Sequence, residues 1–178
     1  MLVYEDVFKA LNKAGIKYVV AGGVAVVLHG YPRYTGDLDL MVYLEKVNLG
    51  RFFDALGKIG FFPKVPVCKK DFQDHRTRER WKKEKNMIVF SFQNRQPPFR
   101  LIDMFVGKPL AFKDVAEKAV CARYGSVTIP IMAIEHLIVL KSDAGRGKDL
   151  EDIVQLRAIQ ERISEEKCDS KKRRSRKA

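Results

Sequence analysis

The sequence predicts an α+β fold, in which a small mixed β-sheet is flanked by helices and followed by C-terminal helices. A β-branched run at residues 18–21 leads into a glycine pair and a short apolar segment, the pattern of a strand, a tight turn and a helix. Further along, segments of strand-like alternation are interspersed with segments whose apolar residues recur at helical spacing. The later strands are expected at 38–42, 87–93, 99–106 and 127–131, and the main helices at 2–14, 49–59, 112–122, 133–141 and 149–163.

Length and composition indicate one compact domain with a helical extension. A chain of 178 residues buries a sizeable core but is short for two full domains. We expect a main unit at 1–132, a helical part at 133–164 packed on it, and a basic, disordered tail at 165–178. No apolar run approaches about 20 residues, and the acidic Glu5 and Asp6 argue against a signal peptide, so we expect a soluble, cytoplasmic protein without a membrane contact.

The excess of basic residues favours a polyanionic partner. The formal net charge is +12 and the isoelectric point is near 9.7, and lysine and arginine displace counterions from phosphate backbones. Much of the excess lies at 69–85 and 167–177. The three cysteines and three histidines lack metal-ligand spacing, so neither a disulfide framework nor a zinc site is expected.

The first two large helices each carry an apolar stripe. The N-terminal one has Glu5 and Asp6 in its opening turn, where the helix dipole favours acidic side chains, and Gly15 ends it. We expect Asn48 to cap the helix at 49–59, because an asparagine side chain accepts hydrogen bonds from the first turn.

The segment 69–85 is densely charged and carries only Phe72 and Trp81 as large apolar residues. We expect a helix or an insertion on the surface, with Trp81 as its anchor. The alternative is a groove for a nucleic-acid backbone, in which Trp81 stacks on a base. In the following strand, Ile88, Phe90 and Phe92 are expected to share one face.

Gly22 and Gly23 directly follow the first strand. Two glycines let the backbone come close to a polyphosphate, and the amide groups of the following helix start would point at it. A glycine pair alone is more often an ordinary turn, so its meaning depends on its neighbours. A Rossmann fingerprint and a Walker A loop are both absent from the chain.

Asp37 and Asp39 lie at the start of the second strand. Residues two apart in a strand point to the same face, so the two carboxylates project together with Cα atoms about 6 to 7 Å apart. This spacing suits a pair of divalent ions that hold the attacking and leaving oxygens in phosphoryl transfer. Mg²⁺ is the expected ion, because it takes few carboxylates and shares phosphate oxygens. A solvated strand end is the alternative.

The glycine pair, the short helix and the Asp-x-Asp motif between apolar residues resemble the DNA polymerase β-type nucleotidyltransferase superfamily. Two sequence motifs are most similar to its bacterial AbiEii-like toxin and minimal nucleotidyltransferase branch: Leu-His-Gly at 28–30 and Arg-Tyr-Thr-Gly-Asp-Leu-Asp-Leu at 33–40. The resemblance implies a nucleotidyltransferase fold whose catalytic core is 1–132, with a third carboxylate on a later strand. Asp103, between Ile102 and Met104, is the match, and pairing with a nearby basic residue is the alternative.

The C-terminal helices contain the second group of residues that the resemblance covers. Lys141 lies on an apolar helical stripe, where it must reach solvent or find an anion. Lys141 and the run Arg-Gly-Lys-Asp at 146–149 are similar to the C-terminal part of AbiEii-like proteins, which implies that Lys141, Arg146 and Lys148 neutralise nucleotide phosphates. Ion pairs with the aspartates of the next helix are the alternative.

The resemblance implies transfer of a nucleoside monophosphate from a nucleoside triphosphate such as ATP to an acceptor hydroxyl. Asp37, Asp39 and Asp103 would hold two Mg²⁺ ions, with Mn²⁺ as a substitute, and Asp103 would also take the proton of the hydroxyl. Thr35 either binds a phosphate oxygen or caps the turn before Asp37. The expected nucleotide-binding residues are Gly22, Gly23, Arg33, Thr35, Lys141, Arg146 and Lys148.

The acceptor stays open at the level of the sequence. The basic surface and tail favour RNA, for example a transfer-RNA end, and membership of the toxin branch would add a cognate antitoxin protein as a partner. Related families modify aminoglycosides or proteins instead. Two other functions are the alternatives: a non-catalytic module of this fold that binds RNA or a protein, and a metal-dependent glycosyltransferase.

Overall fold

The computed structural model describes the backbone of residues 3–107 and 109–175, and the side chains of this part up to residue 166. The fold is α+β, as the sequence predicts. In chain order the elements are α1 (Glu5–Lys13), β1 (Tyr18–Val20), α2 (Gly22–Leu28), β2 (Asp37–Val42), α3 (Lys46–Lys58), β3 (Phe61–Pro63), α4 (Lys69–Gln73), α5 (His75–Lys85), β4 (Val89–Asn94), β5 (Leu101–Phe105), α6 (Phe112–Glu117), β6 (Val120–Tyr124), β7 (Val127–Ile131), α7 (Ile134–Ala144) and α8 (Gly147–Ser175).

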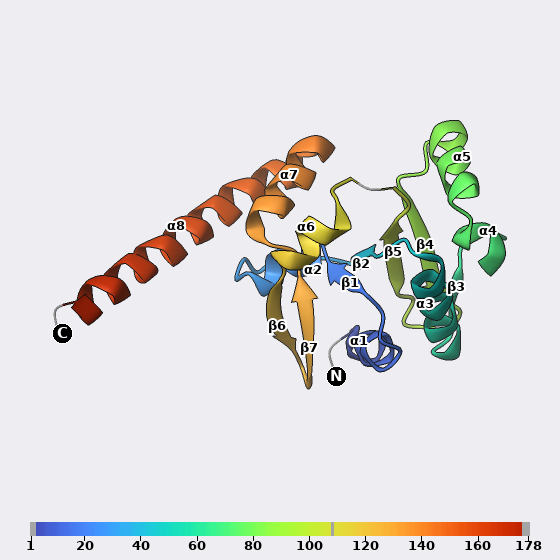
Figure 1. Ribbon diagram of the computed structural model, residues 1–178, viewed down its shortest axis with the longest axis horizontal. Helices are drawn as coiled ribbons and strands as arrows, with labels where there is room; N and C mark the ends of the chain where they lie inside the picture. The colour runs from blue at the N-terminus through green and yellow to red at the C-terminus, as the bar shows by residue number, and fades with distance from the viewer. Residues whose placement is uncertain (1–2, 108, 176–178) are drawn as a thin grey trace.

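A seven-stranded mixed sheet with the order β3-β4-β5-β2-β1-β7-β6 forms the centre of the molecule (Figure 1). β2 pairs in parallel with β5 and antiparallel with β1, and β1 pairs in parallel with β7. The adjacency of the strands that carry Asp39 and Asp103 is therefore confirmed, and the register places these two residues directly opposite each other.

Burial explains why β1 and β2 form the middle of this sheet. All three residues of β1 are buried, which suits its β-branched and aromatic side chains. β2 begins exposed at Asp37 and ends buried at Val42, so its acidic end reaches the surface while its apolar end enters the core. Helix α2 packs on β2 and on α7, α7 packs on α8, and α8 extends away from the body of the molecule (Figure 1).

An aromatic cluster fixes the charged segment 69–85 to the sheet. The segment forms α4 and α5, and Trp81 of α5 is buried and stacks on Phe90 of β4, with ring centroids 5.9 Å apart. The interpretation of Trp81 as an anchor is thus confirmed, because a buried ring is not available to a base. The cluster consists of Phe52, Phe53, Phe72, Trp81, Phe90 and Phe92.

The expected cap of the third helix is wrong. α3 begins at Lys46, and the Glu45 side chain accepts hydrogen bonds from the first-turn amides of residues 47 and 48. Asn48 is instead buried, and its side chain bonds the backbone of Lys17 and the carbonyl of Tyr43. A glutamate at the cap position was not considered, because aspartate and asparagine are the usual cap residues.

Two further expectations about elements need correction. The helix expected at 112–122 ends at Glu117, and the chain returns as β6, the edge strand of a hairpin that turns at Gly125 with a positive φ of 61°. Ile88 precedes β4 and is 68 % exposed, so it does not share the buried face of Phe90 and Phe92.

Helix α8 continues to Ser175, whereas we expected the helix to end near 163 and residues 165–178 to be disordered. Its last turns are rich in Glu, Lys and Arg, which have high intrinsic helix propensity even without an apolar stripe. Residues 176–178 lie outside the described part of the chain. Among the described residues, no helix combines the length and apolarity that a membrane crossing requires.

The structure predicts an acid-sensitive contact between α1 and the β6–β7 hairpin. Hydrogen bonds from Ser126 and the ion pair with Lys9 lower the pKa of Glu5 from 4.5 to about 2. Because the folded pKa is depressed, this contact stabilises the fold above about pH 4.5 and its contribution is lost as the pH falls toward 2. We expect Glu5→Gln to lower the thermal midpoint by a few degrees at pH 7 and by much less at pH 2.5. Thermal unfolding followed by circular dichroism measures both.

The matched control is Glu117→Gln, at an exposed position on α6. It should leave the midpoint unchanged at both pH values. A destabilisation by Glu5→Gln that does not depend on pH would contradict the electrostatic explanation.

Candidate active site

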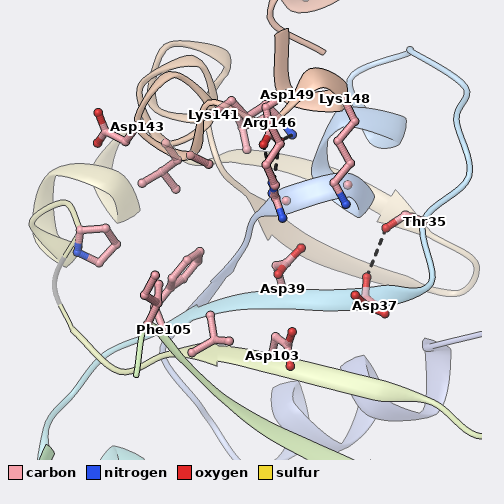
Figure 2. Close-up of a pocket in the computed structure, with 18 of the residues that line it drawn as sticks. Thr35, Asp37, Asp39, Asp103, Phe105, Lys141, Asp143, Arg146, Lys148 and Asp149 are labelled. Atoms are coloured by element: carbon pink, nitrogen blue, oxygen red, sulfur yellow. Dashed lines mark hydrogen bonds and ion pairs between the residues drawn. The ribbon is translucent and has the colours of Figure 1, made fainter. Parts of the chain in front are cut away.

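A cavity of about 1110 Å³ lies above β2 and β5, between α2 and the start of α8 (Figure 2). Every site residue selected from the sequence contributes to its wall. These residues are Gly22, Gly23, Arg33, Thr35, Asp37, Asp39, Asp103, Lys141, Arg146 and Lys148.

Three carboxylates lie along the floor of this cavity. Asp37 and Asp39 project from β2 and Asp103 from β5, while the intervening Leu38 and Ile102 are fully buried in the core. Burial, together with the negative charges of Asp103 and Asp37, raises the pKa of Asp39 to about 6. The two other carboxylates of the expected triad therefore act electrostatically on Asp39.

Ser91 orients the third carboxylate. Its hydroxyl donates to Asp103 Oδ1 at 2.6 Å from the neighbouring strand β4, where the two residues are direct partners. Arg100, an alternative partner for Asp103, instead forms a bidentate ion pair with Asp6 of α1. Sequence reasoning did not select Ser91, although the alternation of β4 places it on the face opposite Phe90, away from the core.

The glycine turn is packed directly against Asp39. Gly22 has a φ of +58°, and a Cβ atom added there would lie 1.8 Å from Asp39 Oδ2. The Gly23 amide donates to the Asp39 carboxylate, and the Ala21 amide donates to the Asp39 carbonyl oxygen at 2.9 Å. Glycine is thus required at position 22 by the carboxylate itself, whatever else binds in the cavity.

Arg33 and Thr35 close over the second glycine. A Cβ atom at Gly23 would lie 2.4 Å from Thr35 Oγ1 and 3.1 Å from Arg33 Nη2. The Thr35 hydroxyl also donates to the Asp37 carbonyl oxygen at 3.4 Å, in agreement with a role in the turn. The loop before β2 therefore brings one hydroxyl and one guanidinium to the same point.

A buried ion network connects this loop to the C-terminal helices. Lys141 of α7 bonds Asp152 at 2.5 Å and Asp149 at 3.2 Å, and all three residues are buried. Asp152 also pairs with Arg33, and Asp149 bonds the guanidinium of Arg146 at 2.6 Å. From the sequence, Asp149 and Asp152 were not expected in the site and appeared only as alternative partners of the basic residues. The structure shows this pairing for Lys141 and Arg146.

The network sets the charge balance on one side of the cavity. Burial opposes ionisation of Asp149, but hydrogen bonds from Arg146 and Lys141 bring its pKa below the ordinary value. Arg33, Lys141 and Arg146 share the two carboxylates of Asp149 and Asp152, so the network has a net positive charge. Beside it, the Lys148 side chain points toward the cavity (Figure 2). This side of the cavity is electropositive and faces the acidic floor.

The donor set of the floor fits hard divalent cations. Asp37, Asp39 and Asp103 offer only carboxylate oxygens, which Mg²⁺ prefers. Within the described residues, no three Asp, Glu, His or Cys side chains are close enough to form a ready-made cage for one ion. An open arrangement of this kind fits ions whose remaining ligands come from a substrate, as in phosphate-bound magnesium sites.

Comparison with known proteins identifies the fold. No protein-family model and no curated protein matches the chain. Among solved structures, the lincosamide antibiotic adenylyltransferase LnuA bound to lincomycin is 15% identical, with a TM-score of 0.56 over 86% of this chain and 93% of that one. ANT(2″)-Ia in complex with adenylyl-2″-tobramycin is 14% identical, with a TM-score of 0.56; the match covers 99% of this chain and 97% of that one. An antigenic nucleotidyltransferase-like protein from Paracoccidioides brasiliensis is 17% identical, with a TM-score of 0.56; the match covers 84% of this chain and 71% of that one. The chain therefore has the nucleotidyltransferase fold.

Gly22→Ala should disrupt the floor of the cavity. The added methyl group collides with the Asp39 carboxylate and the residue must keep a positive φ, so we expect a loss of about 2 kcal/mol or more in the free energy of unfolding. Gly57→Ala is the matched control, since a Cβ atom there meets nothing within 4 Å and the position is helical. Urea titration of both variants measures the difference. Equal stability of the two variants would show that the turn does not pack as described.

Asp103→Asn should lower the pKa of Asp39. Removing a negative neighbour favours ionisation, so we expect the pKa to fall from about 6 toward the ordinary value, with burial keeping it raised in part. Carbon NMR of the labelled carboxyl group follows the titration in the metal-free protein. Asp143→Asn, at the rim of the same cavity, should leave the Asp39 titration unchanged; an unshifted pKa in Asp103→Asn would place the two carboxylates too far apart to act together.

Proposed function

We propose that this protein is a magnesium-dependent nucleotidyltransferase that moves a nucleoside monophosphate from a nucleoside triphosphate to an acceptor hydroxyl. The observation that supports it best is the juxtaposition of three carboxylates from β2 and β5 with a glycine turn and an electropositive wall. The carboxylates suit metal ions and the electropositive wall suits a polyphosphate, so the cavity offers both the metal ligands and the phosphate-binding groups that phosphoryl transfer requires.

The comparisons support the same reaction. LnuA is a lincosamide antibiotic adenylyltransferase, ANT(2″)-Ia was solved with adenylyl-2″-tobramycin, and the likeness spans nearly the whole length of both proteins. Their identity to this chain is low, so they support nucleotidyl transfer through the fold and leave the acceptor to be argued from the cavity. ATP is the donor we propose by analogy with them.

Asp37, Asp39 and Asp103 are the proposed ligands of two Mg²⁺ ions, for which Mn²⁺ would substitute. Burial and then the negative charges of Asp103 and Asp37 raise the pKa of Asp39, and divalent ions held at this point would favour its ionised form. When bound, the ions would lower the pKa of the acceptor hydroxyl and offset the charge that develops on the leaving pyrophosphate.

The protein's own residues would position the triphosphate and move the proton. Gly22 and Gly23 would line the phosphate site beside the floor, and Arg33, Thr35, Arg146 and Lys148 would donate to the phosphate oxygens. Lys141 would contribute its charge through the buried network, which holds Arg33 in place through Asp152 and Arg146 through Asp149.

The covalent step is an in-line substitution at the α-phosphorus. The acceptor oxygen forms a bond to phosphorus while the bond to the bridging oxygen breaks, and the electron pair leaves with pyrophosphate. Asp103 takes the proton from the acceptor hydroxyl, with its carboxylate oriented by Ser91.

The assignment to the AbiEii-like branch is part of this proposal, and the sequence motifs at 33–40 and 141–149 support it. The same branch would place the enzyme in a toxin–antitoxin pair with a cognate antitoxin. The net charge of +12 is the observation that favours RNA as acceptor or as a bound partner. A non-catalytic RNA-binding module is the second candidate, which the same charge favours.

Asp39→Asn should abolish transfer and leave the fold intact. We expect incorporation of label from α-³²P nucleoside triphosphates to fall at least about 100-fold, because the substitution removes the carboxylate next to the glycine turn. Since burial and like charges already disfavour an ionised Asp39, the thermal midpoint at pH 8 should rise or stay unchanged.

Asp114→Asn, at an exposed position on α6, is the control and should transfer label at the normal rate. Normal incorporation by Asp39→Asn would refute the proposed reaction. Magnesium-dependent triphosphate binding without transfer to any RNA, protein or small hydroxylated compound would favour the non-catalytic module.

A further inference from the structure

We propose that the acceptor is a small hydroxylated molecule with an apolar body, bound over Phe105 and Val89 with its hydroxyl at Asp103. The proposal rests on the proposed function and names the class of molecule that this site would modify. It differs from an RNA acceptor, which the overall charge of the chain favours.

The sheet itself places an apolar surface next to the proposed base. Ser91 and Asp103 are direct partners on β4 and β5, and two residues further along the same face Val89 is the direct partner of Phe105. A step of two residues along a strand is about 6.5 Å. A hydroxyl at Asp103 therefore belongs to a molecule whose next atoms lie on the Val89–Phe105 pair.

The cavity continues this apolar surface away from the phosphate side. Ile88 is 68 % exposed although it is a large aliphatic residue, and it is one of the residues that line the cavity. The apolar wall consists of Met87, Ile88, Val89, Phe105, Pro109, Leu137 and Leu140. In Figure 2, Phe105 lies on one side of Asp39 and Asp103, whereas Thr35 and Lys148 lie on the other.

In-line chemistry assigns the two sides to different substrates. The attacking oxygen and the leaving pyrophosphate must lie on opposite sides of the α-phosphorus. Pyrophosphate would leave toward the glycine turn, Arg33 and Lys148, which form the electropositive side. The acceptor must then approach from the side of Asp103 and Phe105, which is the apolar wall.

The charges around this wall argue against a polyionic acceptor. Among the cavity-lining cations that the structure describes, Arg33, Lys141 and Arg146 are paired with the buried aspartates of α8, and Lys148 lies on the side of Thr35. The remaining cation is Lys82, beside Gly107, and Asp143 is the lining carboxylate outside the floor and the ion network. An RNA end needs several cations along its backbone, and an amino sugar with several ammonium groups needs several acids. A largely uncharged molecule needs neither the cations nor the acids, and it gains from burial against the apolar wall.

The test uses 2-(2-naphthyl)ethanol as the probe, added to protein loaded with Mg²⁺ and α,β-methylene-ATP. We expect saturable quenching of naphthyl fluorescence and weakening of at least about tenfold in Ile88→Asp, because a carboxylate on an exposed part of the wall opposes apolar binding. Val154→Asp is the control, since Val154 is 64 % exposed on α8 and does not line the cavity. Affinity for the nucleotide analogue should be the same in all three proteins.

The possible outcomes separate this proposal from the proposed function. If the analogue binds but the naphthyl alcohol does not, the apolar acceptor site is refuted and nucleotide binding stands. If Ile88→Asp weakens analogue binding, the wall holds the nucleobase and the proposal is overturned. Salt-dependent displacement of the probe by a short RNA ending in a 3′-hydroxyl would assign the wall to RNA, whereas displacement only by other apolar alcohols supports the proposal. Failure of the analogue to bind would refute the proposed function and this inference together.

Discussion

Repulsion among three carboxylates is the constraint around which this site is built. Asp37, Asp39 and Asp103 occupy one face of two adjacent parallel strands, so the sheet that holds them together also keeps their charges close. The fold offsets this only partly, through the Gly23 amide and the hydroxyl of Ser91. The remaining negative charge is a cost to stability that a purely structural protein would have no reason to keep.

The helices after the sheet supply the opposite charge and cover one side of the cavity. α7, α8 and the turn between them present Lys141, Lys148 and Arg146, and the two buried aspartates of α8 set how much of that charge reaches the cavity. The cavity is thus polarised: its floor is acidic, one wall is basic and the other is apolar. A triphosphate, a pair of cations and an uncharged alcohol each match one of these surfaces, which is why the proposed reaction and the proposed acceptor fit the same space.

Local patterns predicted the part of the site that local geometry fixes. The two-residue spacing of Asp37 and Asp39 and the glycine turn follow from strand alternation and from the need for a close backbone approach, and both are present in the structure. Asp103 required the resemblance, because nothing near it in the sequence shows that β5 pairs with β2. Asn48 misled the assignment of a helix start, since its amide is used in a buried contact with the backbone of Lys17. Ion pairs across long stretches of sequence, such as the one that holds Arg33, have no periodic pattern from which they could be predicted.

The contact between Arg33 and Asp152 spans 119 positions of the chain, yet it decides where a guanidinium stands beside the glycine turn. Asp152 is buried and bonds both Lys141 and Arg33, so its loss would leave Arg33 without its partner in the network and Lys141 with Asp149 alone. The three residues are therefore coupled. Across homologues, Arg33, Lys141 and Asp152 should change in concert or not at all, and a sequence that retains the acidic floor but has lost this trio would belong to a lineage that binds its nucleotide in another way.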